Sequence, residues 1–384
     1  MSLSRRLFVR SLGIAGATAL SARPGWGSAE AQDVAVGPAK PSGPPPIKLD
    51  ANENPYGPSP AVAKAVAETL AKSGNRYPKN TQDLIDAIAK HHDVPKDNVL
   101  IASGSGELLR VAIPAFTGPT RALAVPVPTF ETCTGVARKL NYPVRELPVD
   151  KALRLDLAGL EDAAGGAGLL YICNPNNPTG TVVPTREIAA ICDRLAARSP
   201  ETFVLVDEAY HHFVADKAYE TMIPRALRDR RLVVTRTFSK IYGLAGLRIG
   251  YAIGHKDTLE LLRAEMSASM FPVTSAAAAL AALGDEAEMK RQIELNNKTR
   301  AFTVKFFESL GYAVAPSETN FVMVDVKRDT AAFQASCKEL GVLVGRPFPP
   351  LKTHSRITVG TWDEMQKAVE ILKKALAQPA PKAA

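Results

Sequence analysis

The feature that most constrains the fold is a series of short apolar runs, rich in β-branched residues, that alternate with helical segments. The runs occupy residues 99–102, 122–127, 169–173, 203–206, 232–235 and 248–253. Helices fit between most of them. Continuous apolar strands separated by helices predict an α/β fold, with a mostly parallel sheet covered by helices on both faces. Such sheets bind ligands beyond the carboxyl ends of their strands.

The pattern changes along the chain and predicts several segments. After residue 286 it becomes mixed, with short strands and helices. We predict a large ligand-binding domain over residues 76–285 and a smaller α+β domain over residues 286–384. Residues 47–75 are predicted to form an N-terminal segment that packs with the smaller domain.

The N-terminus has the organisation of an export signal. Paired arginines, Arg5 and Arg6, precede a modest apolar segment, and an Ala-Glu-Ala cleavage site ends at residue 31. This pattern is typical of a twin-arginine signal peptide over residues 1–31, followed by a flexible linker over residues 32–46. The apolar segment is too short for a stable membrane span. A basic tail and a retained anchor are the alternatives.

The signal predicts a location as well as a partner. We expect the twin-arginine export machinery to recognise the chain and to carry it, already folded, to the periplasm or beyond. If the signal is not used, the protein stays in the cytoplasm.

Composition excludes several classes of protein. The 384 residues are 46% hydrophobic and 22% charged, which is ordinary for a globular protein. The net charge is +8, but no basic run is interleaved with aromatic residues, so we expect no nucleic-acid binding. The cysteines have neither CxxC nor metal-ligand spacing. We therefore predict no metal site and four buried free thiols, at Cys133, Cys173, Cys192 and Cys337.

Polar, turn-forming motifs follow the first three apolar runs. Residues 103–107, Ser-Gly-Ser-Gly-Glu, open a helix whose free N–H groups can bind a phosphate, although a simple tight turn explains them equally well. Phe130 follows the second run, where core packing is the simpler interpretation. Residues 174–180, Asn-Pro-Asn-Asn-Pro-Thr-Gly, follow the third run. Their two Asn-Pro steps predict a fixed turn that directs the Asn177 amide to one place.

Asp207 and Lys240 follow the fourth and fifth runs and carry opposite charges. A carboxylate after a buried strand needs a cationic partner, although a helix N-cap would also explain Asp207. Lys240 lies beside Ser239 and shortly before Arg248, a pattern that can hold an anion and leave one amine free to react. With Tyr210, these residues match the needs of pyridoxal phosphate. Its aldehyde reacts with a lysine, and its ring nitrogen needs an acidic partner.

The motifs resemble those of class I and II pyridoxal-phosphate-dependent aminotransferases, in particular the histidinol-phosphate aminotransferase branch. In chain order they read LDANENPYGPSP, RYP, ASGSGELL, PTF, NPNNPTG, DEAY, TFSKIYGLAGLRIGY and RITVG. The resemblance runs from about residue 48 to the last predicted helix. It implies the fold-type I architecture, with a mostly parallel seven-stranded sheet in the large domain and a smaller α+β domain.

The resemblance also implies how the ring of pyridoxal 5'-phosphate is held. Lys240 would be the Schiff-base lysine and would move the proton at the substrate α-carbon. Asp207 would pair with the ring nitrogen, and Tyr210 and Asn177 would hydrogen-bond the ring 3-oxygen. Phe130 would stack on the ring, where many relatives have tyrosine.

Further roles follow from the same resemblance. Tyr77 matches a tyrosine that reaches the phosphate of the neighbouring subunit, which implies a homodimer with shared active sites. Arg356 matches the arginine that binds the substrate carboxylate with two hydrogen bonds. Arg346 matches a second arginine near the substrate, with a surface charge as the alternative, and Asn320 is expected to line the substrate site. The cofactor phosphate would be held by Ser105, Gly106, Thr237, Ser239 and Arg248.

Two departures from the family leave the substrate open. Relatives that act on histidinol phosphate carry a tyrosine-containing N-terminal segment, whereas residues 43–46 read Gly-Pro-Pro-Pro. Histidine biosynthesis is also cytoplasmic, which conflicts with an export signal. We predict an aminotransferase that moves an amino group between an L-amino acid, or histidinol phosphate, and a 2-oxo acid such as 2-oxoglutarate.

Two other functions are compatible with the motifs. A pyridoxal-phosphate-dependent decarboxylase, lyase or cyclase is the main alternative, because the same electron sink serves all of these reactions. A non-catalytic regulator would need an attached DNA-binding domain, which is not visible before residue 47, and it would not need Lys240.

Overall fold

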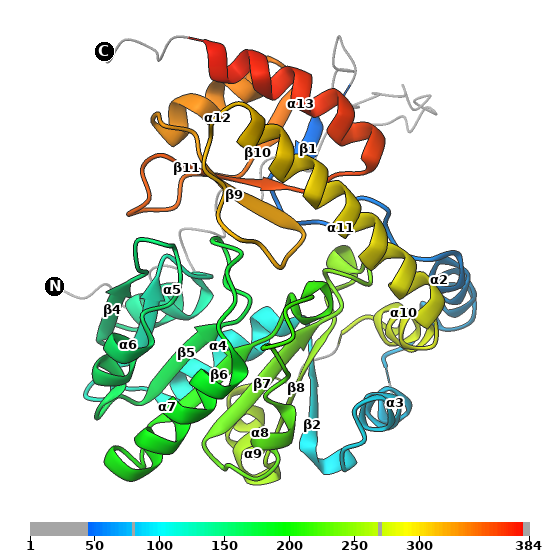
Figure 1. The fold of residues 1–384 in the computed structure, drawn as a ribbon. Helices are drawn as coiled ribbons and strands as arrows, with labels where there is room; N and C mark the ends of the chain where they lie inside the picture. Colours follow the sequence, from blue (N-terminus) through cyan, green and yellow to red (C-terminus); the bar gives the residue numbers. More distant parts are fainter. Residues whose placement is uncertain (1–44, 79–80, 268–270, 379–384) are drawn as a thin grey trace, which may run out of the picture. The chain divides into compact units, whose positions relative to one another are not determined.

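The computed structural model describes residues 45–78, 81–267 and 271–378 (Figure 1). The predicted signal peptide and almost all of the predicted linker lie outside these residues. The described residues from Pro46 onward form one compact unit. The predicted division of that unit at residues 285 and 286 therefore stays a prediction.

A seven-stranded sheet forms the centre of the unit. Its strand order is β2-β8-β7-β6-β5-β3-β4, and only β8 runs antiparallel to its neighbours. The predicted mostly parallel, seven-stranded sheet is thus confirmed. Its strands are β2 (Val99–Ala102), β3 (Leu123–Val127), β4 (Val144–Pro148), β5 (Leu169–Cys173), β6 (Phe203–Asp207), β7 (Leu232–Thr237) and β8 (Gly250–Gly254).

Two of these strands differ from the apolar runs in the sequence. β4 has no matching run, because it is an edge strand whose residues are mostly exposed or half-buried. The last run begins at residue 248 in the sequence, but β8 begins at Gly250. Arg248 lies before the strand and has a left-handed φ of 48°.

Helices cover both faces of the sheet (Figure 1). Along β5, Leu170 and Ile172 belong to one hydrophobic core, whereas Leu169 and Tyr171 belong to the other, because side chains alternate along a strand. The first core also contains side chains of α3 (Gln82–His92), α6 (Leu157–Ala164), α7 (Thr185–Arg198), α8 (Ile223–Ala226) and α10 (Val273–Leu283). The second contains side chains of α4 (Ser105–Phe116), α5 (Thr132–Lys139) and α9 (Lys256–Glu265).

Two small sheets and three helices make up the C-terminal part. β9 (Phe321–Asp325) pairs antiparallel with β11 (His354–Thr358). β10 (Val342–Val344) pairs parallel with β1 (Ile47–Leu49), so the N-terminal strand belongs to a C-terminal sheet. The helices are α11 (Glu286–Ser309), α12 (Thr330–Glu339) and α13 (Trp362–Ala377).

The N-terminal segment contacts two different parts of the unit. Its strand, β1, pairs with β10, whereas its helix, α2 (Pro60–Ser73), packs against α10. The stretch between β1 and α2 therefore spans from the C-terminal sheet to the helices of the central sheet.

The prediction for the cysteines can be compared with the fold. The cysteines at positions 133, 173, 192 and 337 are buried and free, as predicted. No helix in the described ranges is long and apolar enough to cross a membrane.

Three short 3-10 helices complete the fold of the described residues. They are η1 (Lys96–Asn98), η2 (His211–Phe213) and η3 (Ala245–Leu247).

Candidate active site

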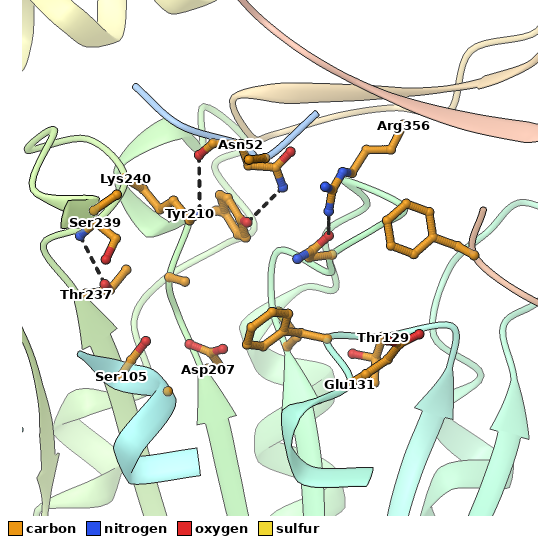
Figure 2. Close-up of a pocket in the computed structure, with 18 of the residues that line it drawn as sticks. Asn52, Ser105, Thr129, Glu131, Asp207, Tyr210, Thr237, Ser239, Lys240 and Arg356 are labelled. Atoms are coloured by element: carbon orange, nitrogen blue, oxygen red, sulfur yellow. Dashed lines mark hydrogen bonds between the residues drawn. The ribbon is translucent and has the colours of Figure 1, made fainter. Parts of the chain in front are cut away.

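A pocket of about 310 Å³ lies at the carboxyl ends of the central strands. This volume falls in the usual range of small-molecule sites, about 300–1,000 Å³. Figure 2 shows Ser105, Asp207 and Thr237 on one side of it, with Asn52 and Arg356 on the opposite side. Most of the predicted site residues line it, namely Ser105, Gly106, Phe130, Asn177, Asp207, Tyr210, Thr237, Ser239, Lys240, Arg248, Arg346 and Arg356.

One end of the pocket is suited to an anion. Helix α4 begins at Ser105, so its free N–H groups point to this end. The preceding Gly104 has φ of 80°, and a Cβ there would lie 2.5 Å from Nη2 of Arg248. A side chain at this position would strain the backbone and would require the guanidinium of Arg248 to move away from the helix start. The hydroxyls of Thr237 and Ser239 lie at the same end, which gives a phosphate several donors at once.

Asp207 is the last residue of β6 and is buried. Its carboxylate accepts hydrogen bonds from Thr235 Oγ1 at 3.1 Å and from the Tyr171 hydroxyl at 3.2 Å. No ion pair within the described residues involves Asp207, and Arg236, a buried arginine on the neighbouring strand β7, pairs with Glu208. No helix begins at Asp207, so the N-cap explanation does not hold. Burial raises the pKa of Asp207 to about 6, so a cationic ligand atom would stabilise its charged form.

Lys240 follows β7 and directs its amine into the pocket (Figure 2). Nζ donates to the backbone oxygen of Asn52 at 3.1 Å. Burial, followed by the nearby charge of Arg356, lowers the pKa of Lys240 to about 8. More of the amine is therefore neutral at physiological pH than for an exposed lysine, which favours attack on a carbonyl group.

Arg356, on β11, connects the two sides of the pocket. Nη1 donates to Asn177 Oδ1 at 2.7 Å, and Nη2 donates to the backbone oxygen of Asp50 at 2.6 Å. Its Nε is buried and has no hydrogen-bond partner among the described residues. The guanidinium also lies 4.8 Å from the ring centre of Phe348. An anionic substrate group at this position would find a desolvated cation held in place by neighbours.

Arg346 and Phe130 lie nearer to solvent. Arg346 forms an ion pair with Glu131, and both side chains are about half exposed. Phe130 is 40% exposed, which excludes simple core packing for this ring. Both residues line the pocket, so each is available to a ligand.

Two predicted site residues do not line the pocket. Tyr77 is 77% exposed, and its predicted contact with a second subunit stays a prediction. Asn320 is buried, and its amide donates to the backbone oxygens of Asn52 and Glu53. Asn320 therefore does not line this pocket, and its expected place in the substrate site stays a prediction. It supports the loop that contains Asn52, because its amide nitrogen donates to that backbone.

The structure also adds residues that sequence reasoning missed. Asn52, Thr129, Glu131 and Phe348 line the pocket, and Asn52 also hydrogen-bonds Tyr210. Asn52 and Thr129 belong to two of the motifs quoted above, LDANENPYGPSP and PTF, which was the available signal. Nothing in the sequence pointed to Glu131 or Phe348.

The donor set fits pyridoxal phosphate. The anion end, the buried carboxylate of Asp207, which has no ion-pair partner among the described residues, and the amine of Lys240 lie around one pocket of suitable size. They match, in turn, the phosphate, the ring nitrogen and the aldehyde of the cofactor. No group of three His, Cys, Asp or Glu in the described residues could hold a metal ion.

Comparisons with known proteins agree with this geometry. The pattern of the family "Aminotransferase class I and II" matches residues 44–372. The histidinol-phosphate aminotransferase of Symbiobacterium thermophilum is 36% identical, over 86% of this chain and 91% of that protein. The aromatic amino acid aminotransferase of Thermobifida fusca is 35% identical, over 78% of this chain and 83% of that protein. The crystal structure of histidinol-phosphate aminotransferase from Sinorhizobium meliloti in complex with pyridoxal-5'-phosphate has a TM-score of 0.80 and 27% identity, covering 86% of this chain and 90% of that one.

Proposed function

This chain belongs to the class I and II aminotransferases, and we propose that its amino donor is histidinol phosphate or an aromatic amino acid, with 2-oxoglutarate as acceptor. The activity itself is that of a pyridoxal-phosphate-dependent aminotransferase, which moves an amino group between an amino compound and a 2-oxo acid. When bound, pyridoxal phosphate supplies an electron sink for bonds at the substrate α-carbon.

Each residue of the pocket has a task in this proposal. Lys240 binds the cofactor in the resting enzyme and later moves the proton at the substrate α-carbon, since its lowered pKa suits both tasks. Asp207 keeps the ring nitrogen protonated, because an anion at this buried position needs a cationic partner. Arg356 would bind the substrate carboxylate or phosphate, and Asn177, whose Oδ1 accepts from Arg356, would offer its amide nitrogen as a donor to the ring 3-oxygen.

The observation that carries the choice of donor is the pairing of two arginines with one aromatic ring in the pocket. Arg356 and Arg346 supply positive charge, and Phe348 supplies apolar surface beside both of them. An anionic group can bind the guanidinium groups, while an imidazole or phenyl ring packs against Phe348. The relatives named above are aminotransferases for histidinol phosphate and for aromatic amino acids, which fits either donor.

A panel of amino donors with 2-oxoglutarate tests this proposal. The purified holoenzyme is given histidinol phosphate, phenylalanine, tyrosine, aspartate and leucine, and glutamate formation is measured. We expect the highest kcat/KM for histidinol phosphate or an aromatic donor. A preference for leucine or aspartate would overturn the choice of donor. Release of carbon dioxide or ammonia without glutamate would instead indicate a decarboxylase or lyase.

We also propose that the enzyme is a homodimer in which Tyr77 completes the partner's site. The large exposure of the Tyr77 ring in a single chain supports this, because exposed aromatic rings often lie at interfaces. Mixing the inactive Lys240→Ala variant with a Tyr77→Ala variant should restore activity after subunit exchange, since one site of the mixed dimer is intact. No recovery in a mixture shown to contain mixed dimers would contradict shared sites.

Finally, we propose that residues 1–31 direct the folded holoenzyme through the twin-arginine pathway. The paired arginines at positions 5 and 6 support this proposal. In a host with this pathway, the full chain should appear in the exported fraction, and an Arg5→Lys, Arg6→Lys variant should stay in the cytoplasm. Equal distribution of both proteins would contradict export by this route.

A further inference from the structure

Asn52 makes more hydrogen bonds to the site than its place in a loop would suggest. It lies between β1 and α2, is only 1% exposed, and has a left-handed φ of 53°. Its side chain and its backbone both bond to other segments, among them Thr358 at the end of β11 and Tyr210 in the pocket wall. Asparagine tolerates this backbone conformation better than most residues do, so the position suits the residue type.

The bonds between Asn52 and Thr358 fix the direction of the Asn52 amide. The backbone N–H of Asn52 can only donate, and it donates to Thr358 Oγ1 at 2.9 Å. The Thr358 hydroxyl then donates its own proton to Asn52 Oδ1 at 3.1 Å. Because Oδ1 is occupied in this way, the amide nitrogen of Asn52 must face the other side.

On that other side lies the Tyr210 hydroxyl. Asn52 Nδ2 donates to it at 3.0 Å. An amide nitrogen has no acceptor capacity, so the Tyr210 hydroxyl cannot donate to Asn52. No other partner of this hydroxyl occurs among the described residues, although Tyr210 is only 3% exposed. Burial raises the pKa of Tyr210, so the hydroxyl keeps its proton near neutral pH. The remaining direction for that proton is the pocket that Tyr210 lines.

We propose that Asn52 is a positioning residue that, oriented by Thr358, forces the Tyr210 hydroxyl to donate its proton into the pocket. The proposal rests on the function above only in that Tyr210 faces the ring 3-oxygen of the bound cofactor. A one-way donor at that oxygen stabilises its negative charge. Asn52 thus sets, through Tyr210, the pH at which the bound cofactor changes its protonation state.

The matched test is the Asn52→Asp variant. Aspartate has nearly the same shape, tolerates the same φ and still accepts from Thr358, but it accepts from Tyr210 where asparagine donates. The Tyr210 proton would then turn away from the pocket. The readout is the pKa of the cofactor absorbance band of the holoenzyme, titrated without substrate. We expect this pKa to rise by about one unit or more, in the same direction as in Tyr210→Phe.

A double-mutant cycle separates this effect from the added charge of aspartate. In the Tyr210→Phe background, Asn52→Asp should raise the pKa far less than it does in the wild type, because both changes act through one hydrogen bond. An equal rise in both backgrounds would mean that only charge matters, and would overturn the proposal. An unchanged pKa in Tyr210→Phe alone would overturn it as well.

Two neutral variants keep the proposal testable if the aspartate variant folds poorly. Asn52→Gly fits the positive φ and removes the amide, and Thr358→Val removes the hydroxyl that orients the amide. Both should raise the cofactor pKa by less than Asn52→Asp does. In these variants the Tyr210 hydroxyl is no longer restricted to donating into the pocket, but no new acceptor at position 52 attracts its proton. A wild-type titration in both variants would contradict the role of this pair. Because no substrate is present, the result does not depend on the identity of the amino donor.

Discussion

The two sides of the pocket are built differently. One side, here called the floor, consists of Ser105, Asp207, Thr237 and Ser239. Ser105 begins helix α4, and the other three lie at or just after the ends of strands β6 and β7. The opposite side, the roof, consists of Asn52, Arg346 and Arg356, from the stretch after β1 and from the region of β10 and β11.

The hydrogen bonds of the two sides differ accordingly. Asp207, on the floor, is held by Thr235 and Tyr171 from neighbouring strands. The roof is connected to the rest of the site by a few hydrogen bonds of Asn52 and Arg356. A floor fixed by the sheet is ready to hold the cofactor before any substrate arrives. The roof, with its guanidinium groups, is suited to recognise the substrate.

Loss of the reactive amine should have the largest effect on this division. In a Lys240→Ala variant we expect kcat to fall by at least about 10²–10⁴-fold, because a positioned acid–base group is lost. The floor still binds the cofactor phosphate, so some cofactor should stay bound without the wild-type absorbance band. Activity with 2-oxoglutarate and cofactor content after dialysis measure the two effects. Lys256→Ala, on the exposed side of α9, is the control, and full activity in Lys240→Ala would exclude the catalytic role.

Asp207→Asn, a change on the floor, should weaken cofactor binding by about 10- to 150-fold, because a charged hydrogen bond is worth about 1.5–3 kcal/mol. The same change should stabilise the cofactor-free protein at pH 7. Burial raises the pKa of Asp207 to about 6 in the folded chain, from 3.8, so its charge costs stability as the pH rises between these values.

The Tm of the two cofactor-free proteins measures this second effect. The Tm gain of Asp207→Asn should be largest at pH 7 and should shrink as the pH falls through 6 toward 3.8, because below 3.8 the wild-type carboxyl is mostly protonated in both the folded and the unfolded state. A less stable Asp207→Asn protein at pH 7 would show that the buried charge is not a cost.

The strand pattern of the sequence places residues of the floor, whereas the roof residues Arg346 and Arg356 were expected only from the family resemblance and Asn52 was missed. Asp207 and Lys240 follow continuous apolar strands, and parallel strands bring their carboxyl ends together at one sheet edge. The strand pattern alone is therefore enough to locate the floor. It missed β4 only because an exposed edge strand has no continuous apolar run.

Roof residues meet the floor through contacts between distant segments. Asn52 bonds to Thr358, 306 positions later in the chain, and no local pattern encodes such a pairing. The same limit applies to Asn320, whose amide nitrogen donates to the backbone of Asn52, a contact that no local pattern predicts. Local sequence periodicity specifies elements, whereas the direction of a single loop side chain depends on its partners.

A change on the roof should leave the cofactor bound and weaken the substrate. For Arg356→Gln we expect KM for 2-oxoglutarate to rise by about 10²-fold or more, since breaking a buried charge pair costs about 2–5 kcal/mol. Cofactor content should stay at the wild-type level. Arg356→Lys keeps the positive charge but cannot form the bidentate hydrogen bonds of a guanidinium, so its KM should lie between those of the wild type and of Arg356→Gln. Loss of cofactor from Arg356→Gln would show that roof and floor are not separate in function.

The same variant has an effect on the pKa of Lys240. After burial, the positive charge of Arg356 is the largest cause that lowers this pKa. In cofactor-free Arg356→Gln the pKa should rise above about 8, so less of the amine is neutral at pH 7 and cofactor capture should be slower. The pH dependence of the capture rate measures this shift, and an unchanged dependence would mean that burial alone sets the pKa.

The smallest expected effect concerns Glu131, which pairs with Arg346 at the edge of the roof. Exposed ion pairs are worth about 0.2–1 kcal/mol, so Glu131→Gln should change KM by only about two- to fivefold. The direction is informative, because Glu131 and an acidic substrate group compete for Arg346. KM for 2-oxoglutarate should fall, and KM for a neutral aromatic donor should not change. Glu146→Gln, which breaks an exposed pair with Arg138 that does not line the pocket, is the matched control. A rise in KM for 2-oxoglutarate would mean that Glu131 holds Arg346 in its binding position, and that this part of the roof is as preorganised as the floor.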